Sequence, residues 1–255
     1  MSGRGAPRDR IRIGSLWVDR VDFEGALDAI DDLVRAQRGG TVFTPNVDHV
    51  VQAEHDPRFR AAYDAVSLSL ADGMPVLWAA RALNKPLPEK VSGSDLILPL
   101  MRRAAERGYR VYFLGGAPGA AQLARQKLLE ELPALQVVGI DDGRIDVDGS
   151  PDVQRPILER INAAKPDLLL VALGAPKQEL WAHEQRASLG NTVSIGVGAS
   201  LDFIAGSQRR APRWMSNAGL EWAYRLGQDP KRLASRYLLR DPQFFGIVAK
   251  QLLAK

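Results

Sequence analysis

The chain has 255 residues, 45% of them hydrophobic, which suffices for one large domain or two small ones with a buried core. It contains no cysteine, which excludes disulfide bonds and thiolate metal sites. Its three histidines form no His-x-x-x-His pair, which disfavours a histidine-based zinc site. No run approaches the ~18–20 apolar residues that cross a bilayer, so we expect any membrane contact to be peripheral.

The chain begins with a segment rich in Arg, Gly and Pro, and we expect residues 1–10 to be a flexible tail. Apolar runs then alternate with amphipathic stretches. Strands are predicted over residues 11–18, 41–44, 66–71, 110–114, 135–140, 167–173 and 192–197. Helices are predicted over residues 23–37, 49–65, 120–131 and 151–164, with two more that begin near residues 93 and 179.

This repetition of strand, loop and helix predicts an α/β fold with a Rossmann-like, largely parallel sheet flanked by helices. Composition changes only near Gly206, so we expect an α/β catalytic domain over residues 11–205 and a basic helical appendage over residues 206–255. Chemistry in such folds collects in the loops that follow the carboxyl ends of the strands.

Two polar clusters follow the first predicted strands of this sheet. Thr44-Pro45-Asn46 offers a hydroxyl and an amide at a rigid corner, although helix capping explains the same residues equally well. Asp72 comes directly after a strand, where a carboxylate can act as a general base toward a sugar hydroxyl. An Asp before Gly73 is also an ordinary turn, and Asp72 by itself favours that interpretation.

The segment from Gly115 to Gly119 lies between a strand and a helix. Its glycines would let backbone N–H groups approach a diphosphate at a helix N-terminus, but a tight turn needs the same glycines. The pattern is neither a P-loop nor Gly-x-Gly-x-x-Gly. A second glycine cluster at residues 196–201 comes closer to the latter pattern, but Leu201 occupies the third glycine position.

A further corner, residues 174–179, carries Lys177, Gln178 and Glu179 together after an apolar strand. Three such groups at a strand end suit a phosphorylated or hydroxyl-rich ligand. The alternative is a solvated first helical turn in which Glu179 complements the helix dipole.

Other polar residues are given structural interpretations. Ser94 or Asp95 is the predicted N-cap of the helix that begins near residue 93, and His49 is expected at the surface of a helix. Asp141 and Asp142 could ligate a divalent metal ion, but they are adjacent and precede Gly, which favours a turn. Trp181 is expected in the core.

The last fifty residues differ in charge from the rest. Between residues 206 and 255 seven Arg and three Lys stand against three acids, a formal charge of +7, so residues 1–205 sum to −3 in a chain of net charge +4. The interleaved aromatic residues are Trp214, Trp222, Tyr224, Tyr237, Phe244 and Phe245. Cations attract phosphates and acidic headgroups, and indole and phenol rings favour the water–lipid boundary. The segment therefore predicts an attachment surface for something anionic.

Taken in order, these motifs resemble the WecG/TagA/CpsF glycosyltransferase family (glycosyltransferase family 26), over roughly residues 11–245. The motifs are Thr44-Pro45-Asn46, Ala71-Asp72-Gly73, Gly93-Ser94-Asp95, Phe113-Leu114-Gly115-Gly116 with Pro118-Gly119, Gly174-Ala175-Pro176-Lys177-Gln178-Glu179, Gly196-Val197-Gly198, Arg210-Ala211-Pro212, Glu221-Trp222-Ala223-Tyr224-Arg225-Leu226 and Pro230-Lys231-Arg232-Leu233. Each motif is weak alone, but the ordered set is specific.

The resemblance implies an inverting transfer of a sugar from a UDP-sugar to a polyprenyl-diphosphate-linked sugar, at the cytoplasmic face of the membrane. The sugar would be N-acetylmannosamine, its uronic acid or glucose. No cofactor and no metal ion is implied. Partners would be the UDP-sugar, the lipid-linked acceptor and an anionic membrane surface, with no nucleic acid and with a homo-oligomer left open.

The resemblance also assigns roles to residues. Asp72 would be the catalytic base, and Thr44 and Gln178 would be active-site residues. The expected substrate-binding residues are Asn46, Asp95, Gly115, Gly116, Gly119, Gly174, Lys177, Glu179, Arg210, Arg225, Arg232 and Arg236. The basic appendage would dock on the bilayer and supply arginines to the diphosphate.

Three alternatives stay open at this point. A nicotinamide-dependent dehydrogenase is compatible with the fold, although Leu201 breaks the dinucleotide-binding pattern. A nucleic-acid-binding module would also use an Arg-rich, aromatic-rich segment. In the third alternative, residues 206–255 are an ordinary helical subdomain with solvated arginines.

Overall fold

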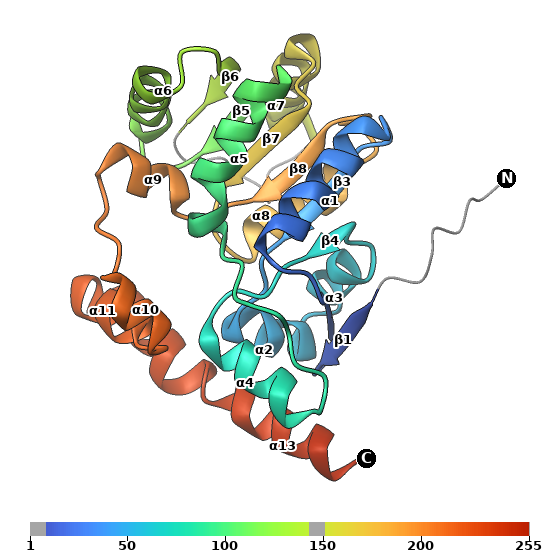
Figure 1. The fold of residues 1–255 in the computed structure, drawn as a ribbon, viewed down its shortest axis with the longest axis vertical. Coiled ribbons are helices and arrows are strands. Elements are labelled where there is room, and N and C mark those ends of the chain that lie inside the picture. Colours follow the sequence, from blue (N-terminus) through green and yellow to red (C-terminus); the bar gives the residue numbers. More distant parts are fainter. Residues whose placement is uncertain (1–8, 143–150, 255) are drawn as a thin grey trace, which may run out of the picture.

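The computed structural model describes residues 9–142 and 151–254. Most of the predicted tail, residues 1–8, and Gly143 of the Asp141-Asp142-Gly143 turn lie outside the described residues. The body is a six-stranded sheet with a layer of helices on each face, and the C-terminal helices run along one end of it (Figure 1). The predicted α/β fold with a largely parallel sheet is confirmed.

All neighbouring strands of the six-stranded sheet are parallel, in the order β4-β3-β8-β7-β5-β6. The strands are β3 (Gly40–Phe43), β4 (Leu68–Ser69), β5 (Arg110–Gly115), β6 (Gln136–Asp141), β7 (Leu168–Ala172) and β8 (Val193–Gly196). Their register aligns one apolar row across the sheet, formed by Leu68, Val42, Ile195, Leu170, Phe113 and Ile140. Because side chains alternate along a strand, this row faces one helical layer and the neighbouring positions face the other.

The two helical layers bury these alternate positions. One layer is formed by α1 (Phe23–Arg35), α5 (Gly93–Arg107), α6 (Ala120–Glu131) and α9 (Ser200–Ala205). The other is formed by α2 (Val47–His55), α3 (Pro57–Asp64), α7 (Pro151–Ala164) and α8 (Lys177–Gln185), together with α4 (Met74–Ala82). Trp181 of α8 is 1% exposed, as predicted. A sheet buried on both faces opens toward ligands only at its edges and strand ends.

Several predicted elements have different bounds in the structure; the strand predicted over residues 66–71, for example, is only β4. The single strand expected over residues 11–18 is an antiparallel hairpin of β1 (Arg10–Ile13) and β2 (Leu16–Asp19), because Gly14 turns the chain with φ of 56°. The single helix expected over residues 49–65 is broken into α2 and α3 at Asp56, which caps α3 before Pro57. The N-cap of α5 is Ser92, two residues before Ser94 and three before Asp95, the two predicted caps.

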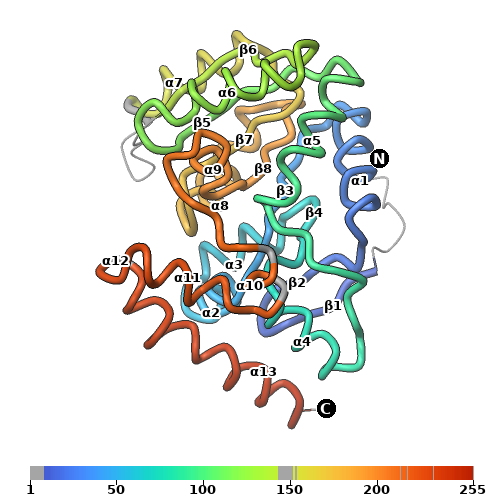
Figure 2. The backbone as a smooth tube through the Cα atoms, turned by 60° about the vertical axis from the view of Figure 1, so that its left-hand side comes forward, coloured from blue at the N-terminus to red at the C-terminus, as the bar shows by residue number. Residues whose placement is uncertain are grey.

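The C-terminal segment is helical, as expected, and lies against the body. It comprises α10 (Arg213–Asn217), α11 (Glu221–Gln228), α12 (Pro230–Ser235), the π-helical turn η1 (Arg236–Arg240) and α13 (Gln243–Leu253). In the tube view α13 passes below α4 and α2 and ends near the β1–β2 hairpin (Figure 2). Phe244 and Val248 join the core, while Gln251 exchanges hydrogen bonds with the backbone of Arg12 and Gly14. None of the described helices combines the length and the apolar character needed to cross a bilayer.

Candidate active site

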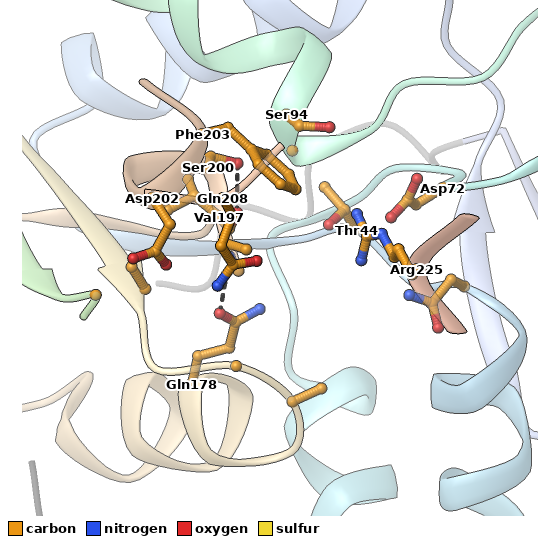
Figure 3. Close-up of a pocket in the computed structure, with 18 of the residues that line it drawn as sticks. Thr44, Asp72, Ser94, Gln178, Val197, Ser200, Asp202, Phe203, Gln208 and Arg225 are labelled. Carbon is orange, nitrogen blue, oxygen red and sulfur yellow. Dashed lines mark hydrogen bonds between the residues drawn. The ribbon is translucent and has the colours of Figure 1, made fainter. Parts of the chain in front are cut away.

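A cavity of about 710 Å³ opens at the carboxyl edge of the sheet. Thr44 follows β3, Gly116 follows β5, Gly174 follows β7 and Gly198 follows β8, and all four line the cavity. In Figure 3, Asp72 and Thr44 lie with Arg225 on one side of this space, and Gln178 and Asp202 lie on the other. Parallel strands deliver their C-terminal loops to one edge, which is why residues far apart in the sequence meet here.

Asp72 is held at the wall of this cavity by its backbone. Its N–H donates to the carbonyl of Pro45 at 2.9 Å, which ties the loop after β4 to the Thr44-Pro45-Asn46 corner. Burial raises the pKa of Asp72 to about 6; the charge of Glu221 adds to the rise, and Arg225 and Lys90 oppose it. A carboxylate with a pKa near neutrality, open to a cavity, is suited to accept a proton from a hydroxyl.

Gln178 is oriented by hydrogen bonds at both ends of its amide. Its Oε1 accepts from the N–H of Gly198 at 3.0 Å, and its Nε2 donates to Oε1 of Glu179 at 2.7 Å. Gly196 makes room for this amide, since a Cβ at that position would lie 2.9 Å from Nε2 of Gln178. Both ends of the Gln178 amide are therefore fixed before any ligand binds.

Glu179 lies beneath the cavity. Its side chain is completely buried, and burial raises its pKa to about 7, against the opposing hydrogen bond from Gln178. The solvated first turn that the sequence left open is therefore wrong for this residue. Lys177, its near neighbour, is exposed and does not line the cavity. Gln178 is the member of this predicted trio that reaches the cavity, and Glu179 supports it from behind.

His49 is the partner of Glu179, and the expectation that it lies on a helix surface is wrong. It is 4% exposed and lines the cavity, and its Nδ1 accepts from the N–H of Asn46 at 3.0 Å. Its Nε2 therefore carries the proton and lies 3.6 Å from Oε1 of Glu179. Burial, followed by the charge of Arg236, lowers the pKa of His49 to about 3, so the ring is neutral. The spacing from Asn46 to His49 is that of a capping box, the local signal that could have revealed it.

The glycine-rich loop after β5 is already occupied by protein acceptors. The N–H of Gly116 donates to Ala172, that of Ala117 to the Asp202 carboxylate and that of Gly119 to the Asp142 carboxylate. Gly116 lines the cavity, whereas Gly115 and Gly119 do not. A ligand diphosphate would have to displace these carboxylates, so the loop shapes the wall rather than offering free amides.

Asp95 and Arg210 meet at a different place. Arg210 forms an ion pair with Asp95, whose other oxygen lies 3.0 Å from Nζ of Lys90. Both residues line a separate cavity on the far side of α5's first turn, and Lys90 also donates to Ser216 of α10. This cluster attaches the start of the C-terminal segment to the body. The sequence predicted ligand contacts for Asp95 and Arg210, whereas in the structure the two side chains contact each other.

Arginines of the C-terminal helices complete the cavity. Arg225 of α11 and Arg236 of η1 line it, and Nη2 of Arg236 donates to Oδ1 of Asn46 at 3.4 Å. Arg236 also lies 3.4 Å from the buried carboxylate of Asp48, and Arg225 forms a 2.6 Å ion pair with Glu221. The side chain of Arg232, the remaining predicted arginine, lies outside the described residues.

Asp202 is the main cavity residue that the sequence reading did not single out. Its side chain is 6% exposed, and Oδ1 accepts from the N–H of Ala117 at 3.0 Å. It sits in α9, which no predicted element covered, so no periodic signal marked it. Within the described part of the chain, no three His, Asp or Glu side chains gather in a group suited to hold a metal ion.

The profile of one protein family matches residues 11–255, nearly the whole chain. It describes the glycosyl transferase WecG/TagA/CpsF family. The chain belongs to this family. Among the relatives of this glycosyltransferase is an N-acetylglucosaminyldiphosphoundecaprenol N-acetyl-beta-D-mannosaminyltransferase of Bacillus spizizenii, 30% identical over 213 residues, which cover 84% of this chain and 80% of the relative.

Membership of the WecG/TagA/CpsF family confirms the resemblance inferred from the ordered motifs. It favours a glycosyltransferase over the dehydrogenase and the nucleic-acid-binding module. The matched range also covers the C-terminal helices, so these helices lie within the sequence that the family shares.

Proposed function

We propose that this protein transfers an N-acetylmannosamine-type sugar, its uronic acid or glucose from a UDP-sugar to a polyprenyl-diphosphate-linked sugar, with inversion at the anomeric carbon. The observation that carries the proposal is a carboxyl group of raised pKa, Asp72, at the wall of a polar cavity that two arginines complete. The relative's printed name, which describes transfer of N-acetylmannosamine to a diphosphoundecaprenol-linked sugar, supports the same reaction class.

The donor would occupy the 710 Å³ cavity, a volume within the range of about 300–1,000 Å³ that ligand pockets span. Thr44 and the Gln178 amide offer a hydroxyl and a fixed amide to the sugar hydroxyls. Arg225 and Arg236 would face the diphosphate, because one guanidinium group can donate two parallel hydrogen bonds to phosphoryl oxygens.

In the proposed step, Asp72 takes the proton of the acceptor hydroxyl. The resulting oxygen nucleophile attacks the anomeric carbon from the face opposite UDP, and the bond to the diphosphate oxygen breaks. UDP leaves with the electron pair, and Arg225 and Arg236 stabilise the negative charge that develops on it. One displacement inverts the configuration, and the proton remains on Asp72 until solvent removes it.

The C-terminal helices would bring the enzyme to the inner face of the plasma membrane. Among the described side chains, eleven large apolar ones are exposed, and eight of these lie at or beyond residue 214. Leu239 is 72% exposed and Leu253 is 88% exposed, in a segment of formal charge +7. Exposed apolar side chains among cations favour an interface with anionic lipids.

The test is a panel of UDP-sugars incubated with a short-chain prenyl-diphosphate-linked N-acetylglucosamine, with released UDP as the readout. We expect acceptor-dependent UDP release with one sugar or a few, and a product of inverted anomeric configuration by NMR. UDP release that does not require the acceptor, or no release with any donor, would contradict the proposal. A relative of this protein acting on the same acceptor class serves as the positive control.

A further inference from the structure

A second cavity, of about 400 Å³, lies on the other side of Asp72. It is enclosed by the start of α2, the start of α4 and the helices α11, η1 and α13. The two cavities share part of their walls. The shared residues are Asn46, Asp72, Arg225, Arg236 and Tyr237. Asp72 therefore stands between two spaces, each of which can present a substrate to it.

The two cavities differ in the character of their walls. The first is lined by backbone turns, amides, hydroxyls and charged groups. The second has a large apolar wall, formed by Val47, Met74, Pro75, Trp222, Leu238, Pro242 and Phe245, and Ser216, Glu221 and Asp241 add polar groups to its lining. A nucleotide or a sugar would leave such a wall without suitable partners, whereas a hydrocarbon chain would cover it.

Polarity is also graded within the second cavity. Asp72 and the guanidinium groups of Arg225 and Arg236 lie where it meets the first cavity. Trp222, Leu238 and Phe245 are 43%, 59% and 62% exposed, so they form its open side. Trp222 and Tyr237 are held against each other across α11 and η1, with ring centroids 6.2 Å apart. A ligand that fits this gradient carries a hydrocarbon tail and a polar head that guanidinium groups can bind.

We infer that the second cavity binds the acceptor's diphosphate and the first isoprene units of its prenyl chain, so that the enzyme recognises the lipid and not only its sugar. This inference rests on the proposed function and says where the acceptor binds. Arg225 and Arg236 line both cavities, so the acceptor diphosphate lies on the opposite side of these arginines from the donor diphosphate. The sugar hydroxyl points to Asp72, and the chain leaves between Leu238 and Phe245. An apolar exit on the C-terminal helices, with the guanidinium groups of Arg225 and Arg236 at its inner end, supports this occupant.

The experiment uses soluble acceptors in the absence of membranes, with the same sugar diphosphate attached to methyl, one, two or three isoprene units. In the wild type we expect the acceptor KM to fall about tenfold or more between methyl and two isoprene units, because methylenes leave water. In Leu238→Ser and Phe245→Ser most of this gain should disappear, while KM for the UDP-sugar stays unchanged. Both side chains are exposed, so the variants should fold.

The matched control is Leu123→Ser, which removes an exposed leucine on α6 that lines neither cavity. It should keep the full gain from the prenyl chain. Equal KM values for the methyl and two-isoprene acceptors in the wild type would overturn the inference and leave the proposed function intact. Loss of the gain in Leu123→Ser to the same extent as in Phe245→Ser would also overturn it.

If no acceptor supports transfer, the proposed function fails, and direct binding decides the inference separately. The probe is then farnesyl diphosphate, compared with inorganic diphosphate and farnesol by calorimetry. Tighter binding of farnesyl diphosphate than of either part, weakened in Phe245→Ser, would support the prenyl site. Equal affinities of farnesyl diphosphate for the wild type and Phe245→Ser would overturn it.

Discussion

The body and the C-terminal helices contribute different kinds of side chain to the active site. On the body side Gln178, Glu179 and His49 are buried and joined by hydrogen bonds or close contacts. On the C-terminal side Arg225 and Arg236 are partly exposed and held mainly by ion pairs. The buried groups are fixed in place by packing, whereas partly exposed ion pairs are weaker and easier to rearrange. From this comparison we expect the body to position the reacting atoms and the C-terminal helices to supply charge and access.

The strongest test of the body side is Asp72→Asn. Loss of a general base costs about 10²–10⁴-fold in rate, so turnover should fall by that factor while UDP binding, measured by calorimetry, stays unchanged. The control is Asp64→Asn, which neutralises an exposed aspartate on α3. Turnover at the wild-type rate in Asp72→Asn would remove Asp72 from the proposed role.

The packing of α13 on the body is tested by two adjacent phenylalanines. Phe244 is 1% exposed and Phe245 is 62% exposed. Phe244→Ala should lower the free energy of unfolding by about 3–5 kcal/mol, whereas Phe245→Ala should change it by less than ~0.5 kcal/mol. Urea unfolding measures both. Similar losses in the two variants would show that α13 does not bury one face against the body.

The charge supplied by the C-terminal side is tested at Arg225. Arg225→Gln should reduce kcat by about 10²-fold, the size of effect seen when one donor to a developing negative charge is removed. Arg225→Lys should recover part of this loss, because it keeps the charge and loses the paired geometry. Arg58→Gln, which removes an arginine from the exposed ion pair with Glu184, is the control and should leave kcat unchanged. An equal kcat in Arg225→Gln and the wild type would exclude this arginine from the step.

The preorganisation of Gln178 is tested without changing Gln178 itself. Gly196→Ala places a methyl group 2.9 Å from Nε2 of Gln178 and should push the amide away from Gly198 and Glu179. Misplacing a substrate-binding group lowers the reaction rate by up to about 10²-fold, so we expect kcat/KM to fall by about tenfold or more. Ser194→Ala, in the same strand and away from the cavity, is the control. An unchanged kcat/KM in Gly196→Ala would mean that the amide's orientation does not matter.

The smallest predicted effect is a shift in the pH profile. Only ionised Asp72 can accept a proton, so activity should fall as the pH drops through about 6. The charge of Glu221 raises the pKa of Asp72. Glu221 also forms an ion pair with Arg225, whose positive charge lowers the pKa of Asp72. Glu221→Gln should therefore move the acidic limb of kcat/KM to lower pH, by about one unit or less. A limb that moves to higher pH, or stays in place, would contradict the assignment of this limb to Asp72.

The fold and part of the site follow from local patterns in the sequence. Alternating apolar runs predicted the strands, and polar residues directly after them predicted that Thr44, Asp72 and Gln178 would lie at one edge of a parallel sheet. These predictions need only the period of a strand and the direction of its neighbours. The ordered motifs, read together, also gave the family.

Other features depended on which residues meet across the fold. His49 and Glu179 are 130 positions apart, and only the packing of α2 against the start of α8 buries both and shifts their pKa values. Asp202 of α9 and Asp142, which follows β6, accept hydrogen bonds from the amides of the loop after β5. No local pattern encodes such encounters, because burial and charge at a site are sums over neighbours from the whole chain.

The sequence by itself therefore determined the α/β fold and the family, and the family resemblance pointed to Asp72 as the expected base. Only the tertiary structure decided that this carboxylate separates a polar cavity from an apolar one, because the second cavity exists only where the C-terminal helices lie against α2 and α4. The physical reason is that strand and helix periods are local, whereas the enclosed space between elements is set by how they pack.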